Sequence, residues 1–138
     1  MGRILCIDYG KKRCGIAVTD PLKIIATGLT TVESDSLIWF LKAYFKDEAV
    51  ERVLVGYPLA LDGSPTDATP AVDKFLRNFQ KVFPDMPVET VDEQYSSAAA
   101  SRAMFEMGMK KKDKERKGAI DEMAATLLLQ EYLSHSGS

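Results

Sequence analysis

The sequence predicts an α/β fold with a mixed five-stranded sheet, in which three antiparallel strands precede two parallel strands and helices cover both faces. Three strand-like segments come first and are separated only by short turns, which is typical of an antiparallel meander. From about residue 34 onward, strand-like and helix-like periods alternate, which favours parallel strands joined by helices. The length of 138 residues corresponds to about one domain, so we expect residues 1–138 to form a single unit.

The first three strands are predicted from short runs of strand-forming residues. Residues 4–7 are apolar and lead into the turn residues at 8–10. Residues 15–19 form a second run, and residues 24–32 are rich in residues that favour strands. Because the links between these runs are short, neighbouring strands are expected to pair antiparallel.

The middle of the chain changes to a helical period. Ser34 or Asp35 can cap a helix, and apolar residues then recur at helical spacing over residues 37–45. Residues 53–56 are short and apolar on both faces, as a central parallel strand is. A loop is expected at residues 61–70, where glycine, serine, proline and aspartate gather.

The last part of the chain predicts three helices and one strand. An apolar stripe over residues 72–83 indicates a helix, and residues 88–91 indicate the fifth strand. A further helix is expected at residues 96–108, and a final helix from about residue 119 to about residue 133. We expect the tail at residues 134–138 to fray.

Charge and composition exclude several classes of protein. No apolar run approaches the ~20 residues of a membrane span, and the N-terminus lacks the layout of an export signal. Cys6 and Cys14 are therefore expected to be reduced thiols in the cytoplasm. The net charge is −2, but residues 110–117 read KKKDKERK and carry +4. This basic run is interpreted either as a solvated loop or as an arm that contacts phosphates.

Acidic residues lie where two predicted strands end and where the last helix begins. Asp8 follows the first strand, Asp92 and Glu93 follow the fifth, and Asp121 lies near the start of the last helix. Taken singly, Asp8 suits a turn and Asp121 suits a helix dipole. Taken together, these residues can meet at one sheet edge, where clustered carboxylates would require a cation such as Mg²⁺.

Four segments carry a resemblance to a known family. They are IDYGKKRCGIA at 7–17, VGYP at 55–58 with DGS at 62–64, VDE at 91–93, and GAID at 118–121 with alanines at 124 and 125. In this order, and over nearly the whole chain, they resemble the motifs of the YqgF/RuvX family. Members of that family are Holliday-junction-resolvase-like proteins, described as candidate pre-16S rRNA nucleases with an RNase H-like fold.

The resemblance implies a metal-dependent nuclease, a hydrolase that acts on phosphodiester bonds. Asp8, Glu93 and Asp121 would be the catalytic residues and would hold Mg²⁺ or Mn²⁺. The substrate would be precursor rRNA, processed during ribosome biogenesis, or else branched DNA. The chain departs from the family pattern at Gln94, where an arginine is usual, and at residues 65–67, where a further arginine is missing.

Two basic clusters are candidates for contacts with nucleic acid. Lys11, Lys12 and Arg13 lie beside Asp8 and could neutralise phosphates, although they also suit a solvated hairpin tip. The second cluster consists of Lys110, Lys111 and Lys112. Tyr9 could stack on a base or lie half-buried, and the basic neighbours of Cys14 could lower its pKa.

Two other classes of function stay open at this point. The turn at Asp8 and Gly10 is also similar to the first phosphate loop of actin-like ATP-binding folds, which need two such domains. A non-catalytic nucleic-acid-binding factor of ribosome assembly would agree with the acidic net charge. The sequence predicts no membrane partner and leaves the oligomeric state open.

Overall fold

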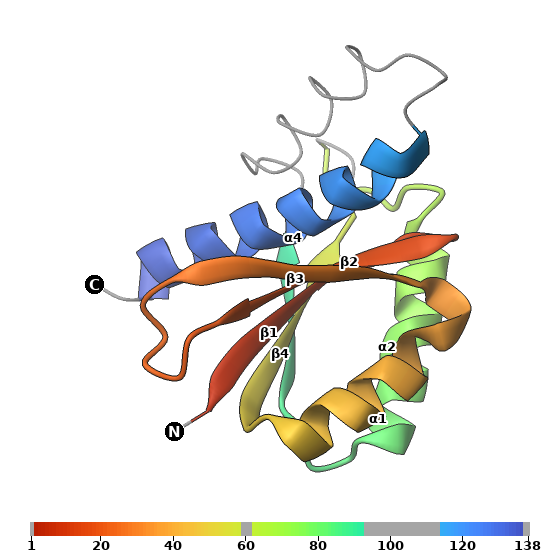
Figure 1. Ribbon diagram of the computed structural model, residues 1–138. Helices are drawn as coiled ribbons and strands as arrows, with labels where there is room; N and C mark the ends of the chain where they lie inside the picture. Colours follow the sequence, from red (N-terminus) through yellow and green to blue (C-terminus); the bar gives the residue numbers. More distant parts are fainter. Residues whose placement is uncertain (1, 59–61, 93–113, 137–138) are drawn as a thin grey trace.

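The computed structural model of the chain describes residues 2–58, 62–92 and 114–136 (Figure 1). Its elements, in chain order, are β1 (Arg3–Asp8), β2 (Arg13–Thr19), β3 (Ala26–Glu33), the short 3-10 helix η1 (Ser34–Ser36), α1 (Leu37–Asp47), β4 (Val50–Tyr57), α2 (Thr69–Val82), β5 (Val88–Asp92) and α4 (Lys114–Ser136). None of the helices described here combines the length and apolar composition that crossing a membrane requires.

The five strands form one sheet in the order β3-β2-β1-β4-β5. β2 pairs antiparallel with β1 and β3, whereas β4 runs parallel to both β1 and β5. These pairings confirm the predicted sheet, with three antiparallel strands followed by two parallel ones. Because β1, β4 and β5 are parallel, their carboxyl ends lie at the same edge of the sheet.

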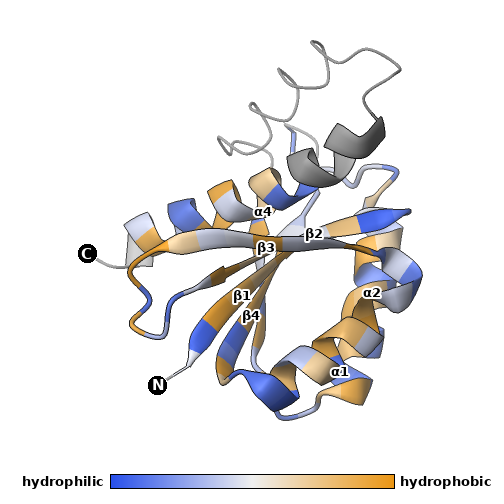
Figure 2. Cartoon of the chain, viewed as in Figure 1, coloured by the Kyte–Doolittle hydropathy of each residue, from blue (hydrophilic) through white to orange (hydrophobic). Residues whose placement is uncertain are grey.

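Helices cover both faces of the sheet, as predicted: α1 and α2 pack on one face, and α4 packs on the other (Figure 1). Side chains of a strand point alternately to opposite faces. On β1, Leu5 and Ile7 therefore face α1 and α2, and Ile4 and Cys6 face α4. The central strands β1 and β4 are hydrophobic over much of their length because both of their faces are covered (Figure 2).

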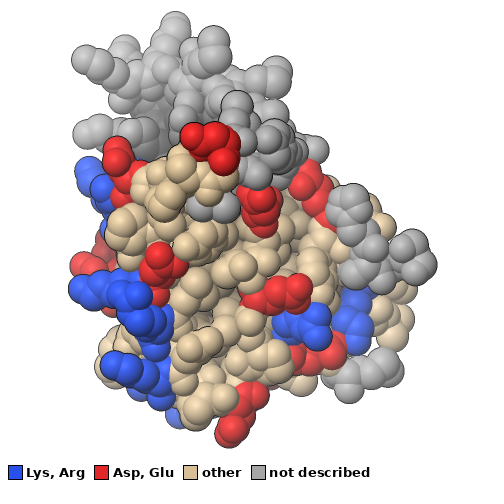
Figure 3. All heavy atoms as spheres, turned by 180° about the vertical axis from the view of Figure 1, so that it is seen from behind, with Lys and Arg blue, Asp and Glu red and all other residues tan. Residues whose placement is uncertain are grey.

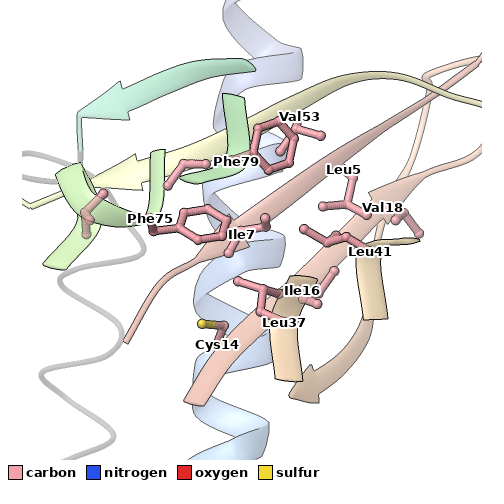
Figure 4. Packing of buried hydrophobic residues seen from close by; sticks show 12 residues of the cluster. Leu5, Ile7, Cys14, Ile16, Val18, Leu37, Leu41, Val53, Phe75 and Phe79 are labelled. Atoms are coloured by element: carbon pink, nitrogen blue, oxygen red, sulfur yellow. The ribbon is translucent and has the colours of Figure 1, made fainter. Parts of the chain in front are cut away.

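The core between the sheet and the helices α1 and α2 is aromatic at one end. Phe75 and Phe79 of α2 reach the sheet beside Ile7 and Val53, and Leu37 and Leu41 of α1 fill the other end (Figure 4). The Phe75 and Phe79 rings lie 5.9 Å apart, centroid to centroid. This packing holds β1 in place, and with it the carboxylate that ends β1.

Helix α4 begins at Lys114, five residues before the expected start, so this part of the prediction is wrong. Residues 114–117 belong to the helix rather than to a basic loop. Lysine, glutamate and arginine are good helix formers, and this propensity outweighs the loop-like look of a charge run. The helix also reaches Ser136, three residues into the segment expected to fray. Residues 96–108, where a third helix was expected, lie outside the described residues.

Strand β3 begins at Ala26, two residues later than expected. The carboxylate of Asp20 accepts hydrogen bonds from the backbone N–H groups of Leu22, Ile24 and Ile25, at 3.1, 2.8 and 2.7 Å. These bonds, above all the one from Ile25, hold the pKa of Asp20 below its usual range. They bind the backbone of residues 22–25 into the turn and so delay the start of the strand.

Candidate active site

Asp8 is the last residue of β1 and is buried, with 6% of its surface exposed. It shares the alternation of Ile4 and Cys6, so its side chain points to the face that α4 covers. Burying a carboxylate is costly unless charged or hydrogen-bonding groups compensate it. Ligands of α/β sheets tend to bind at the carboxyl ends of strands, which is where Asp8 lies.

Gly15 brings helix α4 onto the strand that neighbours Asp8. In the register of β1 and β2, Asp8 lies opposite Gly15. A Cβ atom added at Gly15 would lie only 1.9 Å from the backbone oxygen of Asp121. The backbone of α4 therefore rests directly on Gly15, and Asp121 lies over the residue that pairs with Asp8. This contact places the backbone of Asp121 beside the strand residue that pairs with Asp8.

Asp121 lies about two turns inside α4, because the helix begins at Lys114. The dipole at a helix end acts over the first turn, so it does not explain an aspartate at this position. Only 14% of the Asp121 side chain is exposed. The residue therefore has a position that suits binding better than capping.

Arg13 forms an ion pair with Asp121. Its Nε atom lies 3.3 Å from Oδ2 of the carboxylate, and 36% of the Arg13 side chain is exposed. Arg13 and Gly15 are two residues apart on β2 and therefore face α4 together. The sequence groups Arg13 with the phosphate-binding candidates, but it does not predict this partner. The signal in the sequence is the spacing of Arg13 and Gly15, which puts both residues on the face of the strand that the last helix covers.

Lys11 and Lys12 are exposed in the turn between β1 and β2. The backbone of this turn is tied to η1, because the N–H of Ser34 donates to the Lys12 carbonyl at 3.0 Å and the Ser34 hydroxyl donates to the Gly10 carbonyl at 2.5 Å. The two ammonium groups thus project from a fixed turn at the same edge as Asp8. This placement suits contacts with phosphates that flank the site.

Charges of both signs are mixed on the side of the molecule opposite to Figure 1. Figure 3 shows Lys and Arg side chains interspersed with Asp and Glu there. Most of the Lys and Arg side chains there lie along one edge, with Asp and Glu side chains beside them. The turn with Lys11 and Lys12 lies at the edge of the sheet where β1 ends in Asp8, so it is the better supported place for a polyanion to bind.

Two other residues of the first motif have structural roles. The ring of Tyr9 stacks on Phe75, with 4.9 Å between the ring centroids, and packs against the core. Cys14 is buried, and its Sγ lies 3.5 Å from the Ser34 hydroxyl. Burial raises the pKa of the Cys14 thiol, and the charge of Asp121 adds to this effect. The expectation that basic neighbours lower this pKa is therefore wrong.

Some of the predicted site residues lie outside the described residues. These are Glu93, Gln94 and the basic residues Lys110, Lys111 and Lys112. Glu93 directly follows Asp92, the exposed last residue of β5. Since β5 is parallel to β4 and β4 to β1, β5 ends at the edge where Asp8 lies.

Asp62 has a local role. Its Oδ1 accepts hydrogen bonds from the N–H and the hydroxyl of Ser64, at 2.9 and 2.5 Å. This is the geometry of a turn that an aspartate closes on its own backbone. Asp62 therefore serves the loop between β4 and α2.

The donor set fits a hard divalent cation as far as the structure describes it. Asp8 and Asp121 offer carboxylate oxygens, which Mg²⁺ and Mn²⁺ prefer. Within the described residues no group of three acidic, histidine or cysteine side chains comes together. The predicted third ligand, Glu93, lies outside them, so the described pair can provide two of the three predicted ligands.

The chain matches the model of a protein family over residues 2–135, and that family is described as RuvX, Holliday junction resolvase. A protein of Christiangramia forsetii is 51% identical over 133 residues, which are 96% of this chain and 98% of that protein. A protein of Flavobacterium psychrophilum is 48% identical over 134 residues, 97% of this chain and 98% of that protein. Both are named as candidate pre-16S rRNA nucleases.

A solved structure supports the fold. The resolvase of Fowlpox virus, determined with its substrate Holliday junction DNA, superposes with a TM-score of 0.51 at 11% identity. The match covers 95% of this chain and 98% of the viral one. The sheet order and this likeness confirm the expected RNase H-like fold. The match of the family model, together with relatives that are about half identical over nearly their full length, shows that the chain belongs to the RuvX family.

Proposed function

We propose that this protein is a metal-dependent nuclease that hydrolyses phosphodiester bonds of precursor 16S rRNA during ribosome biogenesis. Membership of the RuvX family and the names of its relatives support this function. The observation that carries it is the contact of α4 with Gly15, because this contact brings Asp121 to the strand end where Asp8 is buried. Such a role places the protein in the cytoplasm.

Asp8, Asp121 and Glu93 would hold Mg²⁺ or Mn²⁺. When bound, the ion would supply an activated water and stabilise charge on the phosphate. Asp8 is suited to the central position, because β1 is the middle strand of the sheet and the core holds it on both faces. Asp121 is presented by a helix whose position is determined by backbone contact with β2. Rigid elements of this kind keep ligand geometry within narrow limits.

Lys11 and Lys12 would bind the phosphates on either side of the scissile bond. They are exposed, they project from a turn whose backbone is fixed, and they are separated from Asp8 only by Tyr9 and Gly10. Contacts of this kind are independent of base sequence and make affinity depend on salt. Lys110, Lys111 and Lys112 would add to this grip.

Resolution of branched DNA is the second candidate function. The description of the matching family as a Holliday junction resolvase favours it. The two substrates share the same phosphodiester chemistry, so the carboxylates serve either. What separates them is the shape of the nucleic acid that the surrounding loops accept.

A cleavage assay on both substrates tests the proposal. End-labelled precursor 16S rRNA and a four-way DNA junction are each incubated with the protein in Mg²⁺, in Mn²⁺ and in EDTA. We expect cleavage of the rRNA in either metal and none in EDTA. Cleavage of the junction alone would make the protein a resolvase, and cleavage of neither would favour a non-catalytic assembly factor.

Two substitutions, one at the site and one far from it, form a test variant and its matched control. Asp8→Asn removes a charge at the site and should abolish cleavage. Asp85→Asn makes the same chemical change in the exposed loop that leads into the opposite end of β5, and it should cleave like the original protein. If Asp8→Asn retained full activity, Asp8 would have no part in the reaction.

A further inference from the structure

Arg13 holds one of the two carboxylates that the proposed cation needs. Its Nε–Oδ2 distance of 3.3 Å joins a guanidinium that is 36% exposed to a carboxylate that is only 14% exposed. The pair lies on the face of β2 that α4 covers, next to the contact between Gly15 and the Asp121 backbone. Arg13 thus places a positive charge beside the Asp121 carboxylate.

We propose that Arg13 is a built-in competitor of the divalent cation: its guanidinium serves as the counter-ion of Asp121 until a cation binds between Asp8 and Asp121 and displaces it. This inference rests on the proposed function, because it assumes that the cation binds at these carboxylates. It assigns Arg13 a positioning role that regulates the site. The ion pair would hold the Asp121 side chain in place and compensate its charge until a cation binds.

The chemistry of the two cations explains the exchange. An arginine does not lose its proton in a protein, so its charge leaves Asp121 only if the side chain moves away. A divalent ion carries twice the charge and approaches carboxylate oxygens to about 2.1 Å, much closer than the guanidinium nitrogen does. A divalent ion that binds Asp8 as well as Asp121 would interact with two carboxylates. The ion pair of Arg13 involves the carboxylate of Asp121.

The structure also allows Arg13 to move without disturbing the sheet. Its backbone is paired with Glu33 of β3, so the strand stays in place while the side chain rotates. The side chain is partly exposed, and the neighbouring residues in the chain, Lys11 and Lys12, are exposed as well. A released guanidinium would join these two residues, where its fork of donors suits a phosphate.

Titration calorimetry with Mn²⁺ alone tests the competition. Arg13→Gln should bind Mn²⁺ about three- to tenfold more tightly, where tenfold corresponds to about 1.4 kcal/mol. Arg13→Lys keeps the charge and should stay within about twofold of the original protein. Lys12→Gln removes the same charge at the neighbouring, exposed position of the same hairpin and should also change the affinity less than about twofold.

The sign of the effect separates this proposal from a merely structural role. If Arg13 only oriented Asp121 for the metal, its loss would weaken Mn²⁺ binding, and that result, or an unchanged affinity, would overturn the proposal. An Asp8→Asn variant that binds Mn²⁺ as tightly as the original protein would instead refute the cation site and the proposed function with it. The two failures are therefore distinguishable.

A second measurement uses the unaltered protein and does not depend on how the variants fold. With ¹⁵N-labelled arginine, the Nε–H resonance of Arg13 reports its contact with Asp121, and Arg13→Lys assigns the resonance by its absence. We expect this resonance to shift as Mg²⁺ is added, with the same midpoint as metal binding. A resonance that stays unchanged at saturating Mg²⁺ would contradict the displacement of Arg13.

Discussion

Replacing Gly15 by alanine should disrupt the contact on which the site depends. The added Cβ would lie 1.9 Å from the Asp121 oxygen and 2.1 Å from its carbonyl carbon. An ordinary contact begins at 3.4 Å, so α4 would have to move away by roughly 1.5 Å. The clashing atoms belong to the backbone, and no change of rotamer relieves the overlap. The helix must therefore shift as a body.

The net cost of this substitution to stability follows from two opposing effects. Overpacking in a well-packed region destabilises by about 1–3 kcal/mol, against a gain of about 0.4–1 kcal/mol because alanine restricts the unfolded chain more than glycine. For a domain of this size, each kcal/mol lowers the melting temperature by roughly 4 °C. We therefore expect Gly15→Ala to melt several degrees lower and to bind Mn²⁺ more weakly, because Asp121 moves away from Asp8.

Gly28→Ala is the matched control. It lies on the neighbouring strand β3 under the same helix, but its Cβ would meet the end of the Glu122 side chain, with Oε1 at 2.5 Å. That side chain can rotate away, so we expect little change in melting temperature or Mn²⁺ affinity. The two variants are compared by thermal unfolding and calorimetry. A Gly15→Ala protein as stable as Gly28→Ala, with unaltered Mn²⁺ affinity, would refute the close contact of α4 with β2.

Three further outcomes are expected. Asp8→Asn should melt at the same temperature as the original protein or slightly higher in metal-free buffer, because it relieves repulsion between carboxylates; a clear drop would make Asp8 a structural residue. Alanine at both Lys11 and Lys12 should reduce the slope of log RNA affinity against log salt by about 0.7–0.9 for each phosphate that these lysines neutralise. Mn²⁺ binding should stay unchanged. An unchanged slope would mean that these residues only contact solvent. Burial raises the pKa of the Cys14 thiol in the folded protein, so the unfolded chain loses this proton at lower pH than the folded protein does. The free energy of unfolding should therefore fall above about pH 8.5. Urea unfolding curves at pH 8 and pH 10 should show a smaller fall for a Cys14→Ala protein.

The sheet and one end of the site were predictable from the sequence because they depend on local patterns. The apolar run before Asp8 predicts a buried strand, and its strict alternation decides which face the Asp8 side chain takes. The short link to β2 predicts the antiparallel partner. The position of Asp8 at the end of a buried strand therefore follows from residues within a few positions of it.

The rest of the site depends on how α4 docks, which local patterns do not determine. The residue that meets Asp121 is Gly15, far away in the sequence, and the ion pair of Asp121 with Arg13 follows from the same docking. The start of α4 differs from the prediction because a run of lysine, arginine and glutamate is equally typical of a solvated loop and of an exposed helix. The charges of residues 114–117 therefore do not distinguish a helix from a loop.

A crystal structure of the protein grown with Mn²⁺ would test the central claim most directly, because anomalous scattering locates the ion. We predict Mn²⁺ bound by both Asp8 and Asp121, with Glu93 as a further ligand and with the Arg13 guanidinium displaced from Asp121. Two-metal sites hold their ions about 4 Å apart, so all the ligating carboxylates must lie close together. If any of the three carboxylates lay more than roughly 10 Å from the other two, or if Mn²⁺ bound elsewhere, the site would be wrong.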